Sequence, residues 1–245
     1  MKVILLGHTQ LSREIVEKII HSDNAELFFD GDVWKEETVD GQVIALAAIR
    51  QCYSHKTALE VLETESEKYF GDKGQEGKRL FNHIVKSGHT STLEHINFTF
   101  TVEGVSRALL AQLTRHRQLS FSVQSQRYNK FSSDSRSGGF DYVIPEIVAR
   151  NEVSKNAFVS MMNTLQSFYD DLIELNIPQE DARSVLPNAA TCNLVTSGNL
   201  RAWLEFYKKR KKGEGAQAEI AEFAEHIKSA IVEVEAWTSE YFDLT

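Results

Sequence analysis

The chain has few cysteines and prolines and no long apolar run. Two cysteines, Cys52 and Cys192, are too few for a disulfide framework and are expected as reduced thiols. No segment approaches the roughly 20 apolar residues that a membrane span needs. The opening MKVILLGHTQ lacks the apolar length and the cleavage-site pattern of a signal peptide. We therefore expect a cytoplasmic protein with no membrane partner.

Positive charge is also scarce, because 35 acidic residues outnumber 27 Lys and Arg and give a net charge of −8. This balance argues against a general nucleic-acid binder, whose affinity depends on many cationic contacts to phosphates. A hydrophobic content of 42% and a charged content of 25% are ordinary for a globular protein. Only three prolines and no low-complexity run occur, so we predict a single domain over residues 1–245.

Hydrophobic periodicity predicts an α+β fold with a mixed or antiparallel sheet flanked by several long helices. Strands are expected at residues 2–7, as a short buried strand, 95–102 and 189–196. Helices are expected at residues 13–20, 43–53, 57–69, 76–86, 106–114, 152–175, 179–185, 199–212 and 216–242. Residues 22–40 are predicted as a surface loop or irregular hairpin, and residues 132–139 as a loop.

One stretch reverses the acidic balance of the chain, since residues 104–133 contain no Asp or Glu. Within it, residues 115–128 hold three arginines, a histidine, three serines and two aromatic residues. Guanidinium groups provide planar, multi-donor positive charge, and hydroxyls add neutral donors, a combination that suits phosphate oxygens. The stretch predicts an anion-binding site. The alternatives are a solvated basic face and arginines paired with carboxylates from elsewhere in the fold.

The same stretch carries a resemblance to a known family. Its pattern, Arg-His-Arg-x-x-Ser-x-x-x-x-Ser-x-Arg over residues 115–127, resembles the signature of the flavin-dependent thymidylate synthases. That family reductively methylates dUMP to dTMP with FAD, NADPH and 5,10-methylenetetrahydrofolate. The resemblance implies the family's fold and activity, and a homotetramer whose sites are shared between subunits. Small molecules, and not nucleic acids, are then the expected partners.

Further segments match the family's substrate-binding blocks. Glu180-x-x-Arg183-x-x-Leu-Pro resembles its second motif, and Asn199-x-Arg201, with Arg210 nine residues later, resembles its third. The resemblance implies that Arg210 contacts the pyrimidine, favours its ionised N3 and is the catalytic residue. It implies that dUMP is bound by Gln112, Arg115, Ser125, Gln126, Arg127, Glu180, Arg183 and Arg210. Other interpretations are a surface ion pair for Glu180 and Arg183, and simple helix-end complementarity for the cations at 208–212.

A further resemblance, that of residues 88–95 to the family's G-H-x-S/T-x-x-E-H segment, bears on FAD binding. There the hydroxyl contacts FAD phosphate and the first histidine lies near the flavin. Together with the signature and the third motif, this resemblance implies that FAD is bound by His89, Ser91, Arg115, His116, Arg117, Asn199 and Arg201. Glu94 and His95 are expected to pair and fix the loop. No metal is expected, because His89 and His95 lack the i, i+4 spacing of helical zinc ligands.

Some positions depart from the family pattern. Val123 stands where relatives carry Glu or Gln, and Glu205 where an amide or histidine is commoner. Neither cysteine is expected to be a nucleophile, and the family requires none. Two other functions remain open. One is a non-catalytic nucleotide- or RNA-binding module using residues 104–133. The other is a metal-dependent nucleotide hydrolase around His89, Glu94, His95 and His116.

Overall fold

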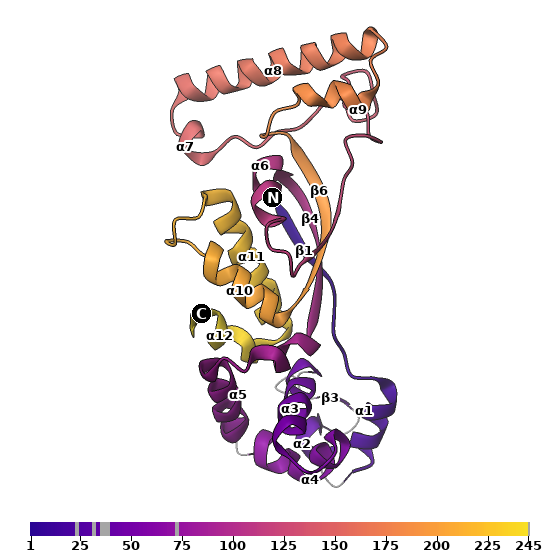
Figure 1. Cartoon of the computed structure of the whole chain (residues 1–245), viewed down its shortest axis with the longest axis vertical. Coiled ribbons are helices and arrows are strands. Elements are labelled where there is room, and N and C mark those ends of the chain that lie inside the picture. The colour runs from indigo at the N-terminus through magenta and orange to yellow at the C-terminus, as the bar shows by residue number, and fades with distance from the viewer. Residues whose placement is uncertain (23–24, 31–32, 35–39, 72–73, 245) are drawn as a thin grey trace. The chain divides into compact units, whose positions relative to one another are not determined.

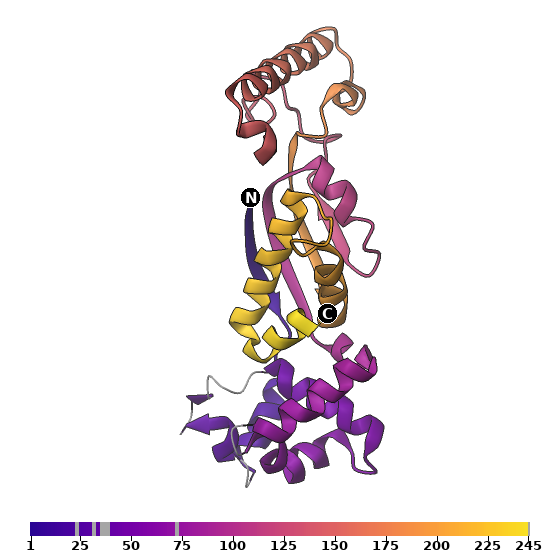
Figure 2. The ribbon, with the colours of Figure 1, turned by 90° about the vertical axis from the view of Figure 1, so that its left-hand side faces the viewer.

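The computed structural model describes residues 1–22, 25–30, 33–34, 40–71 and 74–244. Figures 1 and 2 show its ribbon. In chain order the elements are β1 (Lys2–His8), α1 (Arg13–Ile20), α2 (Ala25–Phe28), β2 (Phe29–Asp30), β3 (Val33–Trp34), α3 (Asp40–Tyr53), α4 (Ala58–Phe70), α5 (Gln75–Ser87), η2 (Thr90–His95), β4 (Asn97–Ser106), α6 (Arg107–Leu113), β5 (Ser120–Val123), α7 (Glu146–Ala149), α8 (Glu152–Glu174), α9 (Gln179–Ala182), η3 (Arg183–Val185), β6 (Thr191–Asn199), α10 (Leu200–Arg210), α11 (Ala218–Val234), η4 (Ala236–Thr238) and α12 (Ser239–Leu244).

The chain forms two compact units, each assembled from separate segments. Unit 1 comprises Met1–Ile4, Phe100–Ser197 and Arg210–His226, and unit 2 comprises Leu5–Thr99, Gly198–Lys209 and Ile227–Thr245. The single domain expected over residues 1–245 stays a prediction. The α+β class with an antiparallel sheet is confirmed, since a four-stranded sheet of order β1-β4-β6-β5 accompanies many helices.

The strand predictions are confirmed in position and corrected in detail. β1 is present, but it is not buried, because it is an edge strand whose Ile4 and Leu6 are 38% and 57% exposed. β4 begins at Asn97, since residues 90–95 form the 3-10 helix η2, and its alternating Phe98, Phe100 and Val102 are fully buried. β5 was not predicted; it pairs antiparallel with β6, with Ser120 opposite Ser197.

The helix predictions agree with local end signals. Thr57 and Glu60 form a capping box that starts α4, and Gly88, with φ of 78°, ends α5 in the left-handed conformation that glycine favours. Asn176, with φ of 63°, follows the end of α8. The predicted loop or hairpin at residues 22–40 lies partly outside the described residues; within them, Phe29 pairs antiparallel with Trp34.

The single helix predicted for residues 216–242 is wrong. α11 ends at Val234, and η4 and α12 follow after Glu235, whose φ of −133° lies outside the helical range. The Glu235 carboxylate is fully buried and accepts hydrogen bonds from Gly41 N–H at 3.0 Å and from the Trp237 indole N–H at 2.5 Å. Periodicity alone could not show that the helix ends at Glu235, because the end depends on a partner distant in sequence, Gly41.

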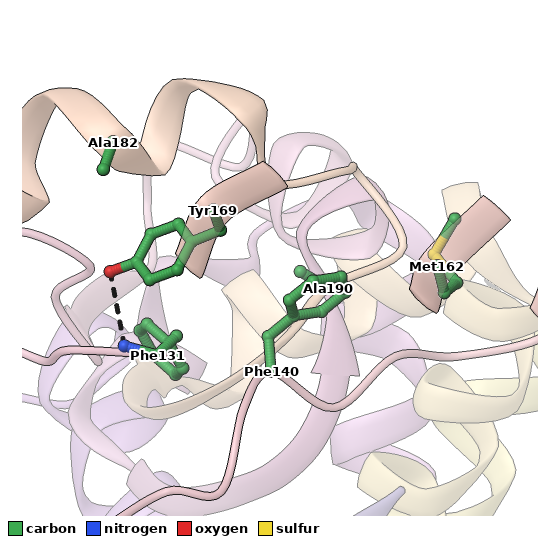
Figure 3. Packing of buried hydrophobic residues seen from close by; sticks show 6 residues of the cluster. All are labelled: Phe131, Phe140, Met162, Tyr169, Ala182 and Ala190. Atoms are coloured by element: carbon green, nitrogen blue, oxygen red, sulfur yellow. Dashed lines mark hydrogen bonds between the residues drawn. The ribbon is translucent and has the colours of Figure 1, made fainter. Parts of the chain in front are cut away.

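The core of unit 1 includes a cluster beneath α8, which Figure 3 shows from close by. Tyr169 on α8 is fully buried, and its hydroxyl accepts a hydrogen bond from Phe131 N–H at 3.3 Å. α8 packs against α9 and η3, so this cluster fixes the segment that carries Glu180 and Arg183. The other buried members of the cluster are Phe140, Met162, Ala182 and Ala190.

Unit 2 contains a helical layer in which α4 packs against α3 and α5; Figure 1 labels the three helices. Ile19, Phe28, Val43 and Leu62 form one of its buried clusters. α3 also contacts η2, which places the 3-10 helix of residues 90–95 against the same layer. Within the described ranges, no helix is both long enough and apolar enough to cross a membrane.

Candidate functional site

The Arg-His-Arg segment lies in a tight turn of unit 1 between α6 and β5. Ser106 accepts from Leu109 N–H to start α6, and buried Leu113 and Leu119 anchor the two sides of the turn. His116 is held by its own backbone, whose N–H donates to Leu113 O at 3.0 Å and whose carbonyl accepts from Leu119 N–H at 3.1 Å. The turn leaves Arg115 and Arg117 exposed and His116 half-buried, so consecutive side chains face different surroundings.

Arg210, at the end of α10, contacts this turn although it is 94 residues away in sequence. Its Nε donates to His116 Nε2 at 3.1 Å and its Nη2 donates to Gln112 O at 3.4 Å. Burial lowers the pKa of Arg210 from its usual value, and the positive charge of Arg115 lowers it further. An arginine nevertheless stays protonated near neutral pH. Two guanidinium groups therefore lie near enough for the charge of one to act on the other, which is an arrangement that favours an anion.

Helix α6 is held at both ends by the start of α11. The Glu219 carboxylate accepts from Ser106 N–H at 2.8 Å and from the Ser106 hydroxyl at 2.5 Å. At the other end, Gln112 Nε2 donates to Gln217 Oε1 at 2.5 Å. From the sequence, residues 216–220 resemble the family block that closes the site, but Gln217 and Glu219 were given no individual roles. Together they fix the helix from which the Arg-His-Arg turn emerges.

A second group of predicted residues gathers at α9 in unit 1. Arg127 donates to Glu180 Oε2 through Nε at 3.1 Å and forms an ion pair with it through Nη2 at 3.0 Å. Gln179 Nε2 donates to Arg127 O at 2.5 Å, and Arg183 Nε donates to Glu180 O at 3.0 Å. The carboxylate of Glu180 thus pairs with Arg127 of the signature, and Arg183 contacts the backbone of Glu180.

Ser125 and Gln126 precede Arg127 and shape its backbone. Ser125 Oγ accepts from Arg127 N–H at 3.1 Å, and Ser125 O accepts from the Asn129 side chain at 2.7 Å. Gln126 is buried with 8% exposure, whereas the Arg127 side chain is 53% exposed. The segment is therefore held by its own hydrogen bonds, while the Arg127 guanidinium, paired with Glu180, stays about half-exposed.

The other predicted FAD residues lie in unit 2, at the start of α10 and around η2. Asn199 Oδ1 accepts from Ala202 N–H at 2.9 Å and so caps α10, and Leu200 N–H donates to Ile96 O at 2.8 Å. Arg201 donates to Glu94 at 2.6 Å and to Glu205 at 3.2 Å. These two hydrogen bonds raise the pKa of Arg201, that to Glu94 more than that to Glu205. The expected pairing of Glu94 with His95 is corrected, because Glu94 pairs with Arg201.

His89 and Ser91 are both exposed on the segment that follows α5. His89 Nδ1 lies 2.7 Å from the hydroxyl of Tyr53, the last residue of α3. Tyr53 was not predicted as a site residue, because nothing in the spacing around it indicates a contact 36 residues away. The FAD candidates therefore divide between the units, with Arg115, His116 and Arg117 in unit 1 and His89, Ser91, Asn199 and Arg201 in unit 2.

Comparison with known proteins places these segments in one family. The family model of thymidylate synthase complementing proteins matches residues 35–235. The chain belongs to this family. Among its relatives, a flavin-dependent thymidylate synthase from Nitratidesulfovibrio vulgaris is 42% identical over 173 residues, which cover 67% of each chain. One from Geobacter sulfurreducens is 37% identical over 175 residues, which cover 71% of each chain.

Two solved structures share the fold of this chain. A flavin-dependent thymidylate synthase from Helicobacter pylori, complexed with FAD and dUMP, matches with a TM-score of 0.63 and 24% identity, covering 99% of this chain and 98% of that one. A UMP/dUMP methylase from Streptomyces cacaoi, bound to 5-Br dUMP, matches with a TM-score of 0.67 and 19% identity, covering 99% and 94%. At these identities the match establishes the fold.

Two chemical features of this thymidylate synthase family member bear on the alternatives. Among the described residues, no group of three or more His, Cys, Asp or Glu side chains is placed to hold a metal ion. Cys192 is 2% exposed, and burial raises the pKa of its thiol, which disfavours the nucleophilic thiolate. Cys52 is exposed on α3.

Proposed function

We propose that this chain converts dUMP to dTMP by reductive methylation, with 5,10-methylenetetrahydrofolate as the carbon donor and NADPH-reduced FAD as the hydride source. The contact between Arg210 and the His116–Gln112 region carries the proposal. It joins the third motif to the signature segment, which is what a single pyrimidine site needs. Family membership supports the same reaction, since relatives that are 42% and 37% identical are named flavin-dependent thymidylate synthases.

Binding of dUMP falls to the guanidinium groups of unit 1. Arg127, held by Glu180 and half-exposed, and Arg183 beside it offer multi-donor cations for a 5′-phosphate. Arg115, Ser125 and Gln126 complete the phosphate and sugar contacts, and Gln112 provides an amide for the pyrimidine edge. Holding the nucleotide at several points fixes the ring for reaction, and such orientation lowers the barrier without any covalent bond to the protein.

Arg210 has the electrostatic role. Methylation at C5 requires the uracil ring to become nucleophilic, so negative charge grows on the ring nitrogen and carbonyl oxygens. A guanidinium held in place by His116 and Gln112 stabilises that charge without having to reorganise during the reaction. This role needs no attack of a cysteine thiol on the ring, which agrees with the burial of Cys192 and the raised pKa of its thiol.

Each unit by itself carries donor groups of the kind that bind the phosphates of FAD. Ser91 and His89 are exposed, and Arg115 and Arg117 are exposed on a segment without acidic residues, so hydroxyl, imidazole and guanidinium donors are available for a pyrophosphate. We assign FAD binding to these residues with His116, Asn199 and Arg201. When bound, the flavin supplies the hydride. We further propose a homotetramer in which neighbouring copies complete each site, and a cytoplasmic location.

The test is direct. Purified protein should be yellow with flavin absorption, and it should form dTMP from dUMP only when methylenetetrahydrofolate and NADPH are both present. Colourless protein that shifts RNA in gels, with a steep salt dependence, would instead support a binding module. Loss of activity on adding a chelator would support the metal-dependent hydrolase.

A further inference from the structure

Tyr53 and His89 form an exposed aromatic pair in unit 2. The Tyr53 hydroxyl lies 2.7 Å from His89 Nδ1, and the two rings stack with an interplanar angle of 21° and a centroid distance of 6.4 Å. Tyr53 is 56% exposed and His89 is exposed, so little other protein covers the pair. The hydrogen bond and the stacking therefore restrain a histidine that otherwise faces solvent.

The backbones on both sides of this contact are fixed. Tyr53 ends α3, whose Val43, Leu46 and Ile49 are fully buried. His89 follows the left-handed cap at Gly88, its N–H donates to Ile84 O at 3.2 Å, and its carbonyl accepts from Thr92 Oγ1 at 3.3 Å. With the main chain held, the side-chain torsions are the freedom that His89 retains, and the Tyr53 hydroxyl restricts them.

The direction of the hydrogen bond has a chemical consequence. A phenol donates readily, and neutral imidazole accepts at one nitrogen while the other carries the proton. If Tyr53 donates to Nδ1, the proton of His89 sits on Nε2, on the opposite side of the ring from Tyr53. His89 then offers a donor of fixed direction to whatever occupies the exposed side.

We propose that Tyr53 is a positioning residue that holds His89 in the orientation and tautomer used beside the flavin. The inference rests on the proposed function for the role of His89 and goes beyond it in assigning Tyr53. Fixing a catalytic side chain before the reaction lowers the entropy lost in reaching the reactive geometry. Loss of the hydroxyl should therefore reduce turnover without weakening nucleotide binding.

A double-mutant cycle on the FAD-loaded enzyme tests this assignment, with Tyr53→Phe, His89→Ala and the double variant. Tyr53→Phe should lower kcat about tenfold, which corresponds to about 1.4 kcal/mol, and leave KM for dUMP within about twofold. In the His89→Ala background the same change should alter kcat by less than about twofold. Equal losses in both backgrounds, or no loss in either, would overturn the proposal. Cys52→Ala, on the same helix turn, is the control and should keep wild-type kcat.

Nuclear magnetic resonance of ¹⁵N-histidine-labelled protein gives a readout that does not depend on activity. Tyr53→Phe should shift the two ring nitrogen signals of His89 toward those of a freely rotating imidazole, whereas Cys52→Ala should leave them in place. If the wild type forms no dTMP, the proposed function fails, and these signals still decide whether Tyr53 restrains His89. Unchanged His89 signals in Tyr53→Phe would refute the restraint even in an active enzyme.

Discussion

Arg210 donates a hydrogen bond from its guanidinium Nε to His116 Nε2, at 3.1 Å. This bond requires the neutral His116 imidazole to accept at Nε2 and to carry its proton on Nδ1. His116 therefore positions the Arg210 side chain, and it is also a residue of the signature segment. A predicted flavin contact and the predicted catalytic arginine are parts of one connected set in unit 1.

Replacing Arg210 by alanine should nearly abolish dTMP formation and leave the protein folded. The arginine lies in the last turn of α10 and is only half-buried, so its removal leaves the packed residues of that helix in place. Loss of one preorganised donor to a developing anion typically costs about 10²–10³ in turnover. Steady-state kinetics and far-UV circular dichroism check both halves of the prediction. Lys209→Ala, one residue earlier and exposed, is the matched control; full activity of Arg210→Ala would refute the assignment.

Replacing Arg127 by alanine should weaken dUMP binding much more than FAD binding. Charge-assisted hydrogen bonds to a phosphate contribute about 1.5–3 kcal/mol each, so a loss of about tenfold to a hundredfold in dUMP affinity is expected. FAD affinity should change by less than about twofold, because the contacts of Arg127 are made to the dUMP candidate Glu180. Equilibrium titration of each ligand measures the two constants, and equal losses in both would contradict this division of roles.

Most of the fold was predictable because its signals are local. The capping box at Thr57, the glycine end of α5 and the alternation of Phe98, Phe100 and Val102 act within a few residues. What was missed depends on distant partners. The break at Glu235 is made by Gly41 and Trp237, and β5 is a strand because β6 lies beside it.

In the candidate site, too, local patterns were predictable and contacts between distant residues were not. The motif residues were found because their spacing is a family pattern, whereas the contacts that hold them were not. Gln217 is 105 residues from Gln112, and Tyr53 is 36 from His89. Glu94 was assigned to its sequence neighbour His95, although Arg201 is its partner at 2.6 Å. Sequence proximity was a poor guide there because an exposed carboxylate pairs with whichever cation the fold brings near.

Replacing Gly41 by alanine should destabilise the protein by about 1–3 kcal/mol, the usual cost of overpacking a buried site. An added Cβ would overlap the buried Glu235 carboxylate, which cannot move away without losing its hydrogen bonds to Gly41 and Trp237. Gly7→Ala is the matched control, because a Cβ there meets nothing within 4 Å. Urea denaturation measures both free energies of unfolding. Equal stability of the two variants would show that the Glu235 side chain can move to accommodate the added methyl group without a loss of stability.

Glu235 should also make the stability of the protein depend on pH. Burial raises the pKa of its carboxyl from 4.5 to about 7, against the opposing effect of the Trp237 hydrogen bond. Between these two values the unfolded chain loses the proton of Glu235 while the folded chain keeps it. The free energy of unfolding should therefore fall as pH rises from about 4.5 to about 7, and this contribution should be constant below and above that window. The total change expected from this group is about 3 kcal/mol.

The variant Glu235→Gln separates this effect from other titrations. Glutamine does not ionise, so the free energy of unfolding of the variant should lack the part of the decline that Glu235 causes. At low pH the variant should be less stable than the wild type, because an amide nitrogen cannot accept a hydrogen bond from Gly41 or Trp237. Burial also raises the pKa of Asp40, which therefore adds a decline of the same sign to both proteins. The decisive quantity is the difference between the two pH profiles, measured by urea denaturation at a series of pH values. Parallel profiles would mean that Glu235 ionises in the folded chain as it does in the unfolded one, and that water or a rearranged α11–η4 corner compensates its charge.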